Sequence, residues 1–263
     1  MSQTPQTTPP LLELRKVSKS FGAVQALKDV DFVAPAGTVT ALVGDNGAGK
    51  STLIKCIGGI HPFDHGQILF EGKEVAIHSP KDAAHLGIEI VYQDLALCDN
   101  LDSVQNMFLG REIRNWLRLL DETPMEIAAG QTLRDLNVTT LKSLRMPVAS
   151  LSGGQRQSVA VAKAVLWKSK LAILDEPTAA LGVAQTAQVL ALVRRLAESG
   201  LGVILISHNL NDVFAVADRI SVLHLGRMAA DVATADVDSQ EVVELITTGR
   251  YRRQPAHAVR EET

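Results

Sequence analysis

A glycine-rich segment, residues 44–52, constrains the fold of this chain more than any other part of its sequence. It reads GDNGAGKST and fits the pattern G-x-x-x-x-G-K-[S/T]. The apolar run TVTALV before it (residues 38–43) predicts a strand, and residues 53–57 predict that a helix follows. Backbone N–H groups in such a loop can surround a phosphate chain at the positive end of the helix dipole. The segment therefore predicts a phosphate-binding loop in an α/β fold.

Two side chains of this loop are expected to act on a nucleotide directly. The Lys50 ammonium would reach the β and γ phosphates of ATP, and the Ser51 hydroxyl would coordinate Mg²⁺. The residues predicted to bind the nucleotide are Gly44, Asp45, Asn46, Gly47, Ala48, Gly49, Lys50, Ser51 and Thr52. A glycine turn without a ligand is the alternative for the motif alone, and the strand and helix around it argue against that alternative.

The rest of the chain alternates apolar runs with amphipathic segments, which predicts a mostly parallel sheet flanked by helices, a P-loop NTPase core. Two early strands, at 11–17 and 30–33 with a turn at Phe21 and Gly22 between them, predict an N-terminal antiparallel β region. Residues 101–144 have helical spacing and few strand signals, so we expect them to be mostly helical, within an inserted helical subdomain of about residues 101–167. Further strands are expected at 67–70, 88–92, 171–174, 203–206 and 219–225, and helices at 153–166 and 183–197.

One domain, residues 11–249, is expected between a disordered leader (1–10) and a flexible tail (250–263). The net charge of −3 gives no general attraction for nucleic acid or anionic lipid, so phosphate binding has to be local. Cys56 and Cys98 lack metal-site or disulfide spacing, and the start of the chain lacks the apolar core of a secretory signal. No apolar run approaches the ~20 residues that span a bilayer. These features favour the cytoplasm.

Two carboxylates, Asp175 and Glu176, follow the apolar run 171–174, where a parallel sheet presents its ligand-binding edge. Asp175 would hold Mg²⁺, directly or through water, and Glu176 would activate or orient the attacking water. His208 and Gln93 follow two other apolar runs and are expected at the same edge. A helix cap or solvated edge is the alternative for the acids, and an ordinary polar loop residue is the alternative for the other two. Beside the glycine loop, these residues favour a Mg²⁺-dependent nucleotide hydrolase.

A second glycine-containing helix start lies about a hundred residues after the first. It comprises Ser152, Gly153, Gly154 and Gln155 in the sequence LSGGQ. Its bare backbone suits an anion, and the alternative is a serine-capped helix start with a flexible turn. The hydrolase interpretation alone does not explain it.

Five motifs, taken in order, resemble those of the nucleotide-binding subunit of ATP-binding cassette (ABC) transporters. GDNGAGKS resembles the Walker A loop, VYQD the Q-loop, LSGGQ the signature sequence, LAILDE the Walker B strand and ISHN the switch-histidine segment, over about residues 11–249. The resemblance implies that two cassettes pair head to tail and hold each ATP between the Walker A loop of one and the signature of the other. Ser152 to Gln155 would then face a γ-phosphate bound by a partner subunit.

The resemblance also assigns roles to single residues. It implies that Phe21 stacks on adenine, with an ordinary core position as the alternative. It implies that Gln93 senses Mg²⁺ and the attacking water, and that His208 contacts the γ-phosphate. One departure is Gly182, which stands where the family usually has an aspartate after A-L. That departure affects the expected coupling between the two composite sites and removes no phosphate or Mg²⁺ ligand.

The segments VYQDLALCDNLDSVQNMFLGRE and DEPTAALGV are similar to the monosaccharide importer branch, of the ribose, xylose and fructose type. The resemblance implies a peripheral ATPase on the cytoplasmic side of the inner membrane, working as a homodimer or with a separate cassette subunit. Its partners would be an integral membrane permease and, indirectly, a periplasmic or extracellular sugar-binding protein, without nucleic acid. The alternatives are an importer of another small solute, a soluble cassette ATPase acting on ribosomes or DNA, and a nucleotide-binding regulator without turnover.

Overall fold

The computed structural model describes residues 9–167 and 169–250, so most of the expected leader (1–10) and tail (250–263) lies outside the described residues. In chain order the elements are β1 (Leu12–Phe21), β2 (Val24–Ala34), β3 (Val39–Val43), α1 (Lys50–Ile57), β4 (His65–Phe70), β5 (Lys73–Val75), α2 (Pro80–Leu86), β6 (Ile88–Val91), α3 (Ser103–Phe108), α4 (Glu122–Asp135), α5 (Gly153–Leu166), β7 (Leu171–Asp175), α6 (Val183–Glu198), β8 (Gly202–Ile206), α7 (Leu210–Val216), β9 (Arg219–His224), β10 (Arg227–Ala233) and α8 (Ser239–Thr248).

A six-stranded sheet in the order β10-β9-β3-β8-β7-β6 carries the glycine loop at the end of β3. Its strands are parallel except β10, which runs antiparallel to β9. Every residue of β3 and β8 is buried, which explains why these strands read as unbroken apolar runs. Val91 of β6 pairs with Leu174 of β7, and Leu174 pairs with Leu205 of β8. The carboxyl ends of these three strands therefore reach the same edge of the sheet.

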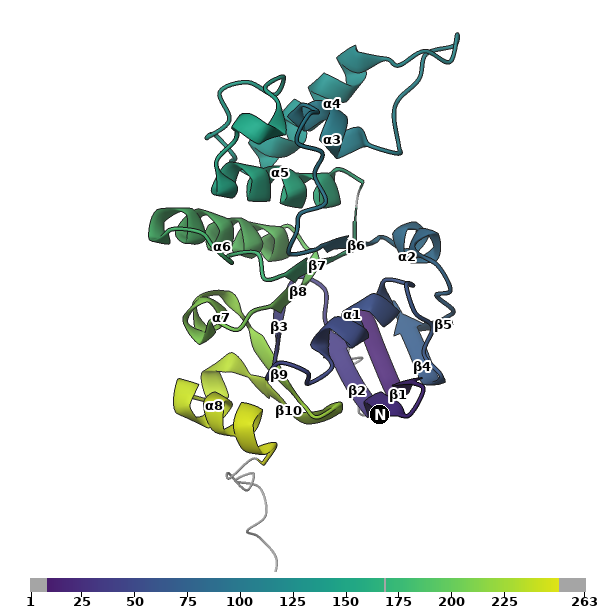
Figure 1. Cartoon of the computed structure of the whole chain (residues 1–263), viewed down its shortest axis with the longest axis vertical. Helices are drawn as coiled ribbons and strands as arrows, with labels where there is room; N and C mark the ends of the chain where they lie inside the picture. Colours follow the sequence, from purple (N-terminus) through teal and green to yellow (C-terminus); the bar gives the residue numbers. More distant parts are fainter. Residues whose placement is uncertain (1–8, 168, 251–263) are drawn as a thin grey trace, which may run out of the picture.

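A second, antiparallel sheet has the order β2-β1-β4-β5 and lies beside α1 (Figure 1). Leu53 and Ile57 of α1 belong to the same buried cluster as Leu12 of β1 and Phe32 of β2. This packing fixes α1, and with it the glycine loop, between the two sheets. The predicted α/β class with an N-terminal antiparallel region is confirmed.

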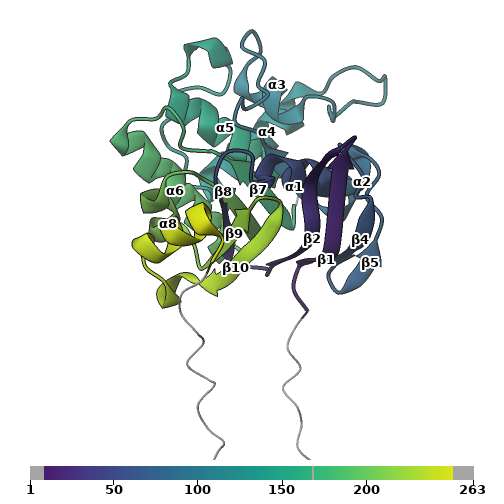
Figure 2. The ribbon, with the colours of Figure 1, turned by 60° about the horizontal axis from the view of Figure 1, so that its bottom comes forward.

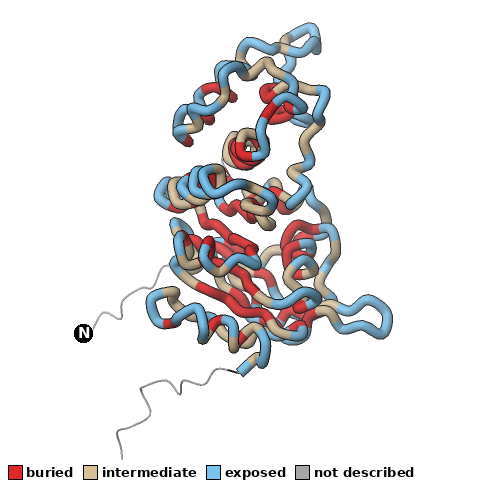
Figure 3. The backbone as a smooth tube through the Cα atoms, turned by 60° about the vertical axis from the view of Figure 1, so that its left-hand side comes forward, coloured by how far each residue is buried: buried red, intermediate tan, exposed pale blue. Residues whose placement is uncertain are grey.

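The helices are divided between the two sides of the six-stranded sheet. Figures 1 and 2 show α6 and α8 on one side and α1 on the other. Buried residues concentrate on the strands between these helices (Figure 3), as expected for a sheet covered on both faces.

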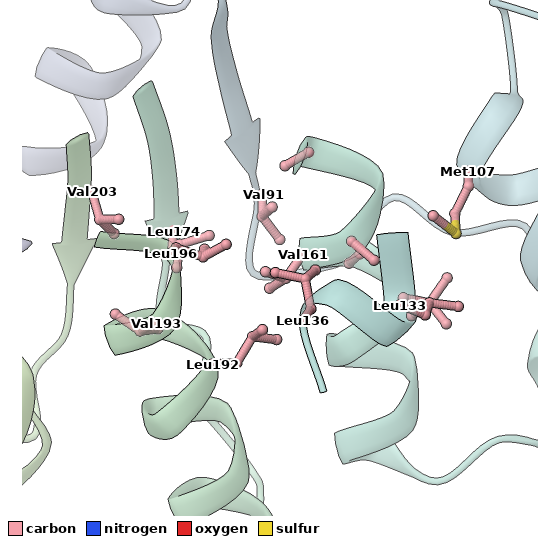
Figure 4. Packing of buried hydrophobic residues seen from close by; sticks show 14 of the residues in the cluster. Val91, Met107, Leu133, Leu136, Val161, Leu174, Leu192, Val193, Leu196 and Val203 are labelled. Atoms are coloured by element: carbon pink, nitrogen blue, oxygen red, sulfur yellow. The ribbon is translucent and has the colours of Figure 1, made fainter. Parts of the chain in front are cut away.

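The helix α5 connects α3 and α4 to the sheet, directly at β6 and through α6. It packs against α3, α4 and α6, and their apolar side chains belong to one buried cluster that also includes β7 and β8. Figure 4 shows one member of this cluster from each element: Leu133 of α4, Val161 of α5, Leu192 of α6 and Leu174 of β7. A displacement of α5 would therefore disturb packing on both of its sides.

The prediction that residues 101–144 are mostly helical is wrong. Only α3, of 6 residues, and α4, of 14, are helical there. Between them the chain forms a turn in which Arg114 pairs with Leu120 as an antiparallel bridge. The side chain of Asn115 accepts hydrogen bonds from the N–H groups of Leu117 and Leu119, at 3.0 and 3.1 Å. Such side-chain-to-backbone bonds favour a turn over a helix, whatever the apolar spacing.

Five elements are absent from the prediction, namely β5, α2, α7, β10 and α8. In addition, β2 begins at Val24 rather than at residue 30. Its first six residues, VQALKD, mix apolar and polar side chains without regular alternation, and most of them are exposed, which weakens the signal of a strand. In the part of the chain that the structure describes, no helix has the length and apolarity needed to cross a bilayer.

Candidate functional site

The glycine loop has a backbone that only glycine fits at two positions. Gly44 has φ +155° and Gly49 has φ +107°, both in the region that side chains disfavour. A Cβ atom at Gly44 would lie 2.3 Å from the carbonyl oxygen of Leu223, and one at Gly49 would lie 2.8 Å from that of Ala26. The loop can approach β2 and β9 this closely because both side chains are missing.

The first turn of α1 has no side-chain cap. Its N-cap residue is Gly49, and no side chain accepts a hydrogen bond from the first N–H groups. Uncapped N–H groups at a helix start need water or a ligand, and the helix dipole favours an anion there. This geometry suits the phosphate chain that the sequence predicts.

A cavity of about 470 Å³ opens beside this helix start. Both sheets contribute to it, because β2 lines one side and the turn between β9 and β10 lines another. The lining residues are Val24, Gln25, Ala26, Asn46, Gly47, Gly49, Lys50, Ser51, Thr52, Leu225 and Gly226. The glycine-rich motif predicted the loop residues of this cavity. The residues of β2 and of the β9–β10 turn were not predicted, because they belong to no motif and reach the cavity only through the pairing of distant strands.

The Lys50 side chain folds back over the loop that precedes it. Its Nζ atom donates hydrogen bonds to the carbonyl oxygens of Gly44, at 2.7 Å, and Asp45, at 3.0 Å. Partial burial lowers the pKa of Lys50, and the negative charges of Glu176, Asp45 and Asp175 oppose this effect. The ammonium therefore already lies near the acids predicted to act with it.

Asp175 and Glu176 lie at the carboxyl end of β7, as predicted. Burial raises the pKa of Asp175, and the nearby charge of Glu176 raises it further, against the effect of Lys50. Glu176 has a left-handed backbone with φ +50°, and its N–H donates to the carbonyl oxygen of Ile206 at 3.0 Å. This conformation ends the strand abruptly, and the hydrogen bond ties the turn to the end of β8.

His208, after β8, pairs with Glu176 across the two strand ends. The distance from Nδ1 of His208 to Oε2 of Glu176 is 2.7 Å. The Glu176 side chain is only 15% exposed, whereas that of His208 is 74% exposed. A sheltered carboxylate thus contacts an imidazole that is open to a ligand from outside the chain.

Gln93 and Phe21 both lie at the surface. Gln93 follows β6 and is two residues beyond Val91, just as Glu176 is two residues beyond the paired Leu174. Phe21 is 44% exposed, which excludes the alternative of an ordinary core position. Its ring centroid lies 5.2 Å from that of His61 in an edge-on contact. Phe21 also pairs with Val24, a residue of the cavity wall, so it is placed near the cavity.

The start of α5 is capped by its own side chains. Ser152 Oγ accepts from the N–H of Gln155 at 3.4 Å, and Gln155 Oε1 accepts from the N–H of Ser152 at 2.9 Å. Gln155 Nε2 also donates to the carbonyl oxygen of Thr140 at 2.6 Å. The serine-capped helix start, one of the two interpretations of LSGGQ, is therefore present in the structure.

The two glycines of LSGGQ let α5 begin close to the segment that precedes α6. A Cβ at Gly153 would lie 3.0 Å from Cδ2 of Leu181, and one at Gly154 would lie 3.2 Å from Cβ of Gln185. Gln185 Oε1 in turn accepts from the N–H of Gly182, at 3.2 Å. Gln185 thus joins the LSGGQ segment to the position where an aspartate was expected, and no motif drew attention to it.

The predicted residues therefore form two separate groups within one chain. Lys50, Asp175, Glu176 and His208 lie at or beside the cavity end of the sheet. The LSGGQ segment instead contacts Thr140, Leu181 and Gln185, and α5 lies beyond α6 as seen from α1 (Figure 1).

Comparisons with known proteins agree with this geometry. A family model described as "ABC transporter" matches residues 27–179. The chain is 48% identical to the xylose/arabinose import ATP-binding protein XylG of Sulfolobus acidocaldarius, over 90% of this chain and 94% of that protein. It is 45% identical to the fructose import ATP-binding protein FrcA of Rhizobium meliloti, again over 90% and 94%.

Two further similarities concern length and fold. The ribose import ATP-binding protein RbsA of Lacticaseibacillus paracasei is 37% identical over 88% of this chain, and the match covers 46% of that protein. A crystal structure of a nucleotide-free ATP-binding cassette from an ABC transporter has a TM-score of 0.77 at 27% identity, covering 89% of this chain and 98% of that one. The chain thus spans about half of the ribose relative and nearly the whole of the solved cassette.

Proposed function

Because this chain belongs to the ABC transporter family, we propose that it is the ATP-hydrolysing subunit of a membrane importer for a small sugar. One observation carries the proposal: the Glu176–His208 pair, at 2.7 Å, lies at the strand ends next to an uncapped, glycine-built helix start. The relatives are named as import ATP-binding proteins for xylose/arabinose, for fructose and for ribose, and these names support a monosaccharide as the cargo. The choice of sugar would belong to the permease and the binding protein.

ATP would bind with its phosphates on the glycine loop and its base toward Phe21. The uncapped N–H groups of α1 and the Lys50 ammonium would neutralise the phosphates, and Lys50 needs only to exchange its carbonyl partners for phosphate oxygens. The exposed ring of Phe21 offers a face for stacking on adenine.

Hydrolysis would depend on the carboxylate of Glu176. That carboxylate would orient the attacking water or accept its proton, while His208 holds the carboxylate in place and contacts the γ-phosphate. Gln93, at the neighbouring strand end, would sense the same water. The left-handed turn at Glu176 directs the chain away from the sheet immediately after Asp175, so the two acids can have different partners.

The residues present fit a magnesium ion bound together with nucleotide. Mg²⁺ is usually held by one or two carboxylates and by substrate phosphates, so it needs few protein ligands. Within residues 9–167 and 169–250, no group of three or more His, Cys, Asp and Glu side chains could hold a metal by itself. Ser51, Asp175 and Gln93 would hold Mg²⁺, and its charge would offset that of the β and γ phosphates.

A second cassette would complete the site. The residues at the start of α5, Ser152 to Gln155, are held rigidly by the capping interactions and by Leu181 and Gln185. They would face the γ-phosphate of a partner, and the partner's equivalent residues would face the nucleotide on this chain. The assembly would lie on the cytoplasmic side of the inner membrane, attached to an integral permease that a sugar-binding protein supplies.

The experiment that tests this function is the substitution Glu176→Gln. The variant should bind ATP as the wild type does, lose at least about 100-fold in turnover, and accumulate as an ATP-bound dimer. Phosphate release and size-exclusion chromatography with ATP measure the two effects. Glu74→Gln, an exposed acid on β5, is the matched control and should change neither. Wild-type turnover in the Glu176→Gln protein would refute the catalytic role.

A further inference from the structure

The segment between α3 and α4 presents an unusual concentration of exposed apolar side chains. Six of the thirteen large hydrophobic side chains that are exposed among the described residues lie within residues 109–120. They are Leu109, Ile113, Trp116, Leu117, Leu119 and Leu120. Trp116 is 89% exposed, and the segment projects from the rest of the molecule in both Figure 1 and Figure 2.

This segment, residues 113–121, is a hydrogen-bonded turn, which we call the tryptophan hairpin. The N–H of Asp121 donates to the carbonyl oxygen of Ile113, and the N–H of Asn115 donates to that of Leu119, both at 2.9 Å. The Asn115 side chain accepts from two more backbone N–H groups. Its backbone donors are largely satisfied internally, so the apolar side chains can enter an apolar medium at little cost to the backbone.

The charges around the hairpin tip are positive. The hairpin contains two exposed arginines, Arg114 and Arg118, and one acid, Asp121, at its last position. Of the acids near its base, Glu112 lies 4.0 Å from Arg114, while Glu122, Glu126 and Asp102 contact Arg145, at 3.0, 2.7 and 3.3 Å. The hairpin therefore joins two exposed arginines, of which Arg114 lies 4.0 Å from the Glu112 carboxylate, to a tryptophan and several leucines, although the chain as a whole is acidic.

We propose that the tryptophan hairpin inserts into the headgroup region of an anionic lipid bilayer. Tryptophan and arginine are the residues that favour this region, because each has an apolar body and a polar group that stays in contact with water. Arginines near the surface are attracted to anionic headgroups. A projecting turn that is exposed on several sides needs no complementary groove when the receiving medium is fluid, which favours lipid over a protein partner.

The proposal rests on the proposed function only in placing this chain at a membrane. One exposed hairpin with two cations gives weak, reversible binding by itself, comparable to a single membrane signal. Together with a permease, it would fix the tilt of the helices α3, α4 and α5 relative to the bilayer. The ion pair between Arg111 and Glu89, at 2.7 Å, ties the base of the hairpin to β6 and so to the segment that carries Gln93.

Vesicle flotation tests the proposal with the full chain and no permease. A Trp167→Phe background leaves Trp116 as the single tryptophan. With vesicles of phosphatidylcholine and phosphatidylglycerol at 3:1, the protein should float, and Trp116 fluorescence should shift to the blue and be quenched by brominated lipid. Trp116→Ser combined with Leu119→Ser, read by flotation, should lower the partition coefficient by roughly tenfold or more. Arg114→Gln with Arg118→Asn should lower it about tenfold on these vesicles and not on pure phosphatidylcholine.

Ile127→Gln, which removes an exposed apolar side chain from α4, is the matched control and should bind like the background protein. The proposal is overturned if the background protein does not float, or if the hairpin variants bind vesicles as well as the background protein does. Either result leaves a protein as the partner of the hairpin. A measurement of ATP turnover without vesicles distinguishes failure of the lipid proposal from failure of the proposed function. The hairpin variants should hydrolyse ATP at the wild-type rate, whereas a wild type without turnover would refute the proposed function and leave the lipid result standing.

Discussion

The helices α1 and α5 both begin with glycines, and they satisfy their first N–H groups in opposite ways. At α1, Gly49 provides no side-chain acceptor, and Gly44 lets the loop pass a neighbouring carbonyl group. At α5, Ser152 and Gln155 cap each other, and the glycines serve to admit Leu181 and Gln185. The same residue type therefore has two purposes: the first helix start is left open for a ligand, and the second is completed in advance and positioned as a rigid unit.

The largest effect should come from distorting the glycine loop that leads to the open helix start. Gly44→Ala would place a Cβ at 2.3 Å from the Leu223 carbonyl oxygen in a disfavoured backbone conformation. We expect the free energy of unfolding to fall by about 3 kcal/mol or more, with loss of ATP binding. Thermal unfolding and nucleotide titration measure the two effects. Gly47→Ala is the matched control: its φ is also positive, but no atom lies within 4 Å, so only about 1 kcal/mol should be lost.

Removing the cap at the other helix start should have a smaller effect on stability and a different effect on function. Ser152→Ala removes the acceptor for the Gln155 N–H and should cost about 1 kcal/mol. ATP affinity of the isolated subunit should not change, whereas turnover, which is proposed to need this segment from a partner, should fall. Ser79→Ala removes the equivalent cap of α2 and should cost a similar amount without changing turnover. Equal turnover in the two variants would contradict the comparison.

The smallest effect on stability concerns the carboxylate beside the open helix start. The pKa of Asp175 is raised in the folded protein, so the unfolded chain releases this proton first as pH rises. Ionisation of Asp175 therefore lowers stability between its ordinary pKa and its raised value, and the loss persists above it. Asp175→Asn should slightly increase the free energy of unfolding at neutral pH and remove that part of its pH dependence, while abolishing turnover. A stability curve against pH from 3 to 8 decides the point.

The sequence predicted what depends on short segments and missed what depends on distant pairing. The glycine loop and the strand ends at Asp175 were identifiable because their signals lie within a few residues. The contact between Glu176 and His208 needed the register of β7 against β8. The cavity wall at Leu225 depends on β9, which pairs with β3 across more than 170 residues of chain.

Two elements show why local patterns were insufficient elsewhere. The run WLRLL within the tryptophan hairpin has apolar residues at helical spacing, yet Asn115 bonds turn it back and leave it exposed. The helix α8 was not predicted, although it has a clear start signal in the sequence, with Asp238 and Glu241 forming a capping box. The turn at WLRLL could be recognised only from the three-dimensional structure, whereas the start of α8 could be recognised from the sequence.

The left-handed backbone at Glu176 affects which replacements the fold would favour at this position. A glutamate held at φ +50° costs roughly 1–2 kcal/mol that glycine would not. The catalytic role proposed for Glu176 would account for an acid at this strained position. In a duplicated copy that no longer needed this proposed role, glycine at this position would relieve the backbone strain, so copies without turnover should tolerate that replacement well.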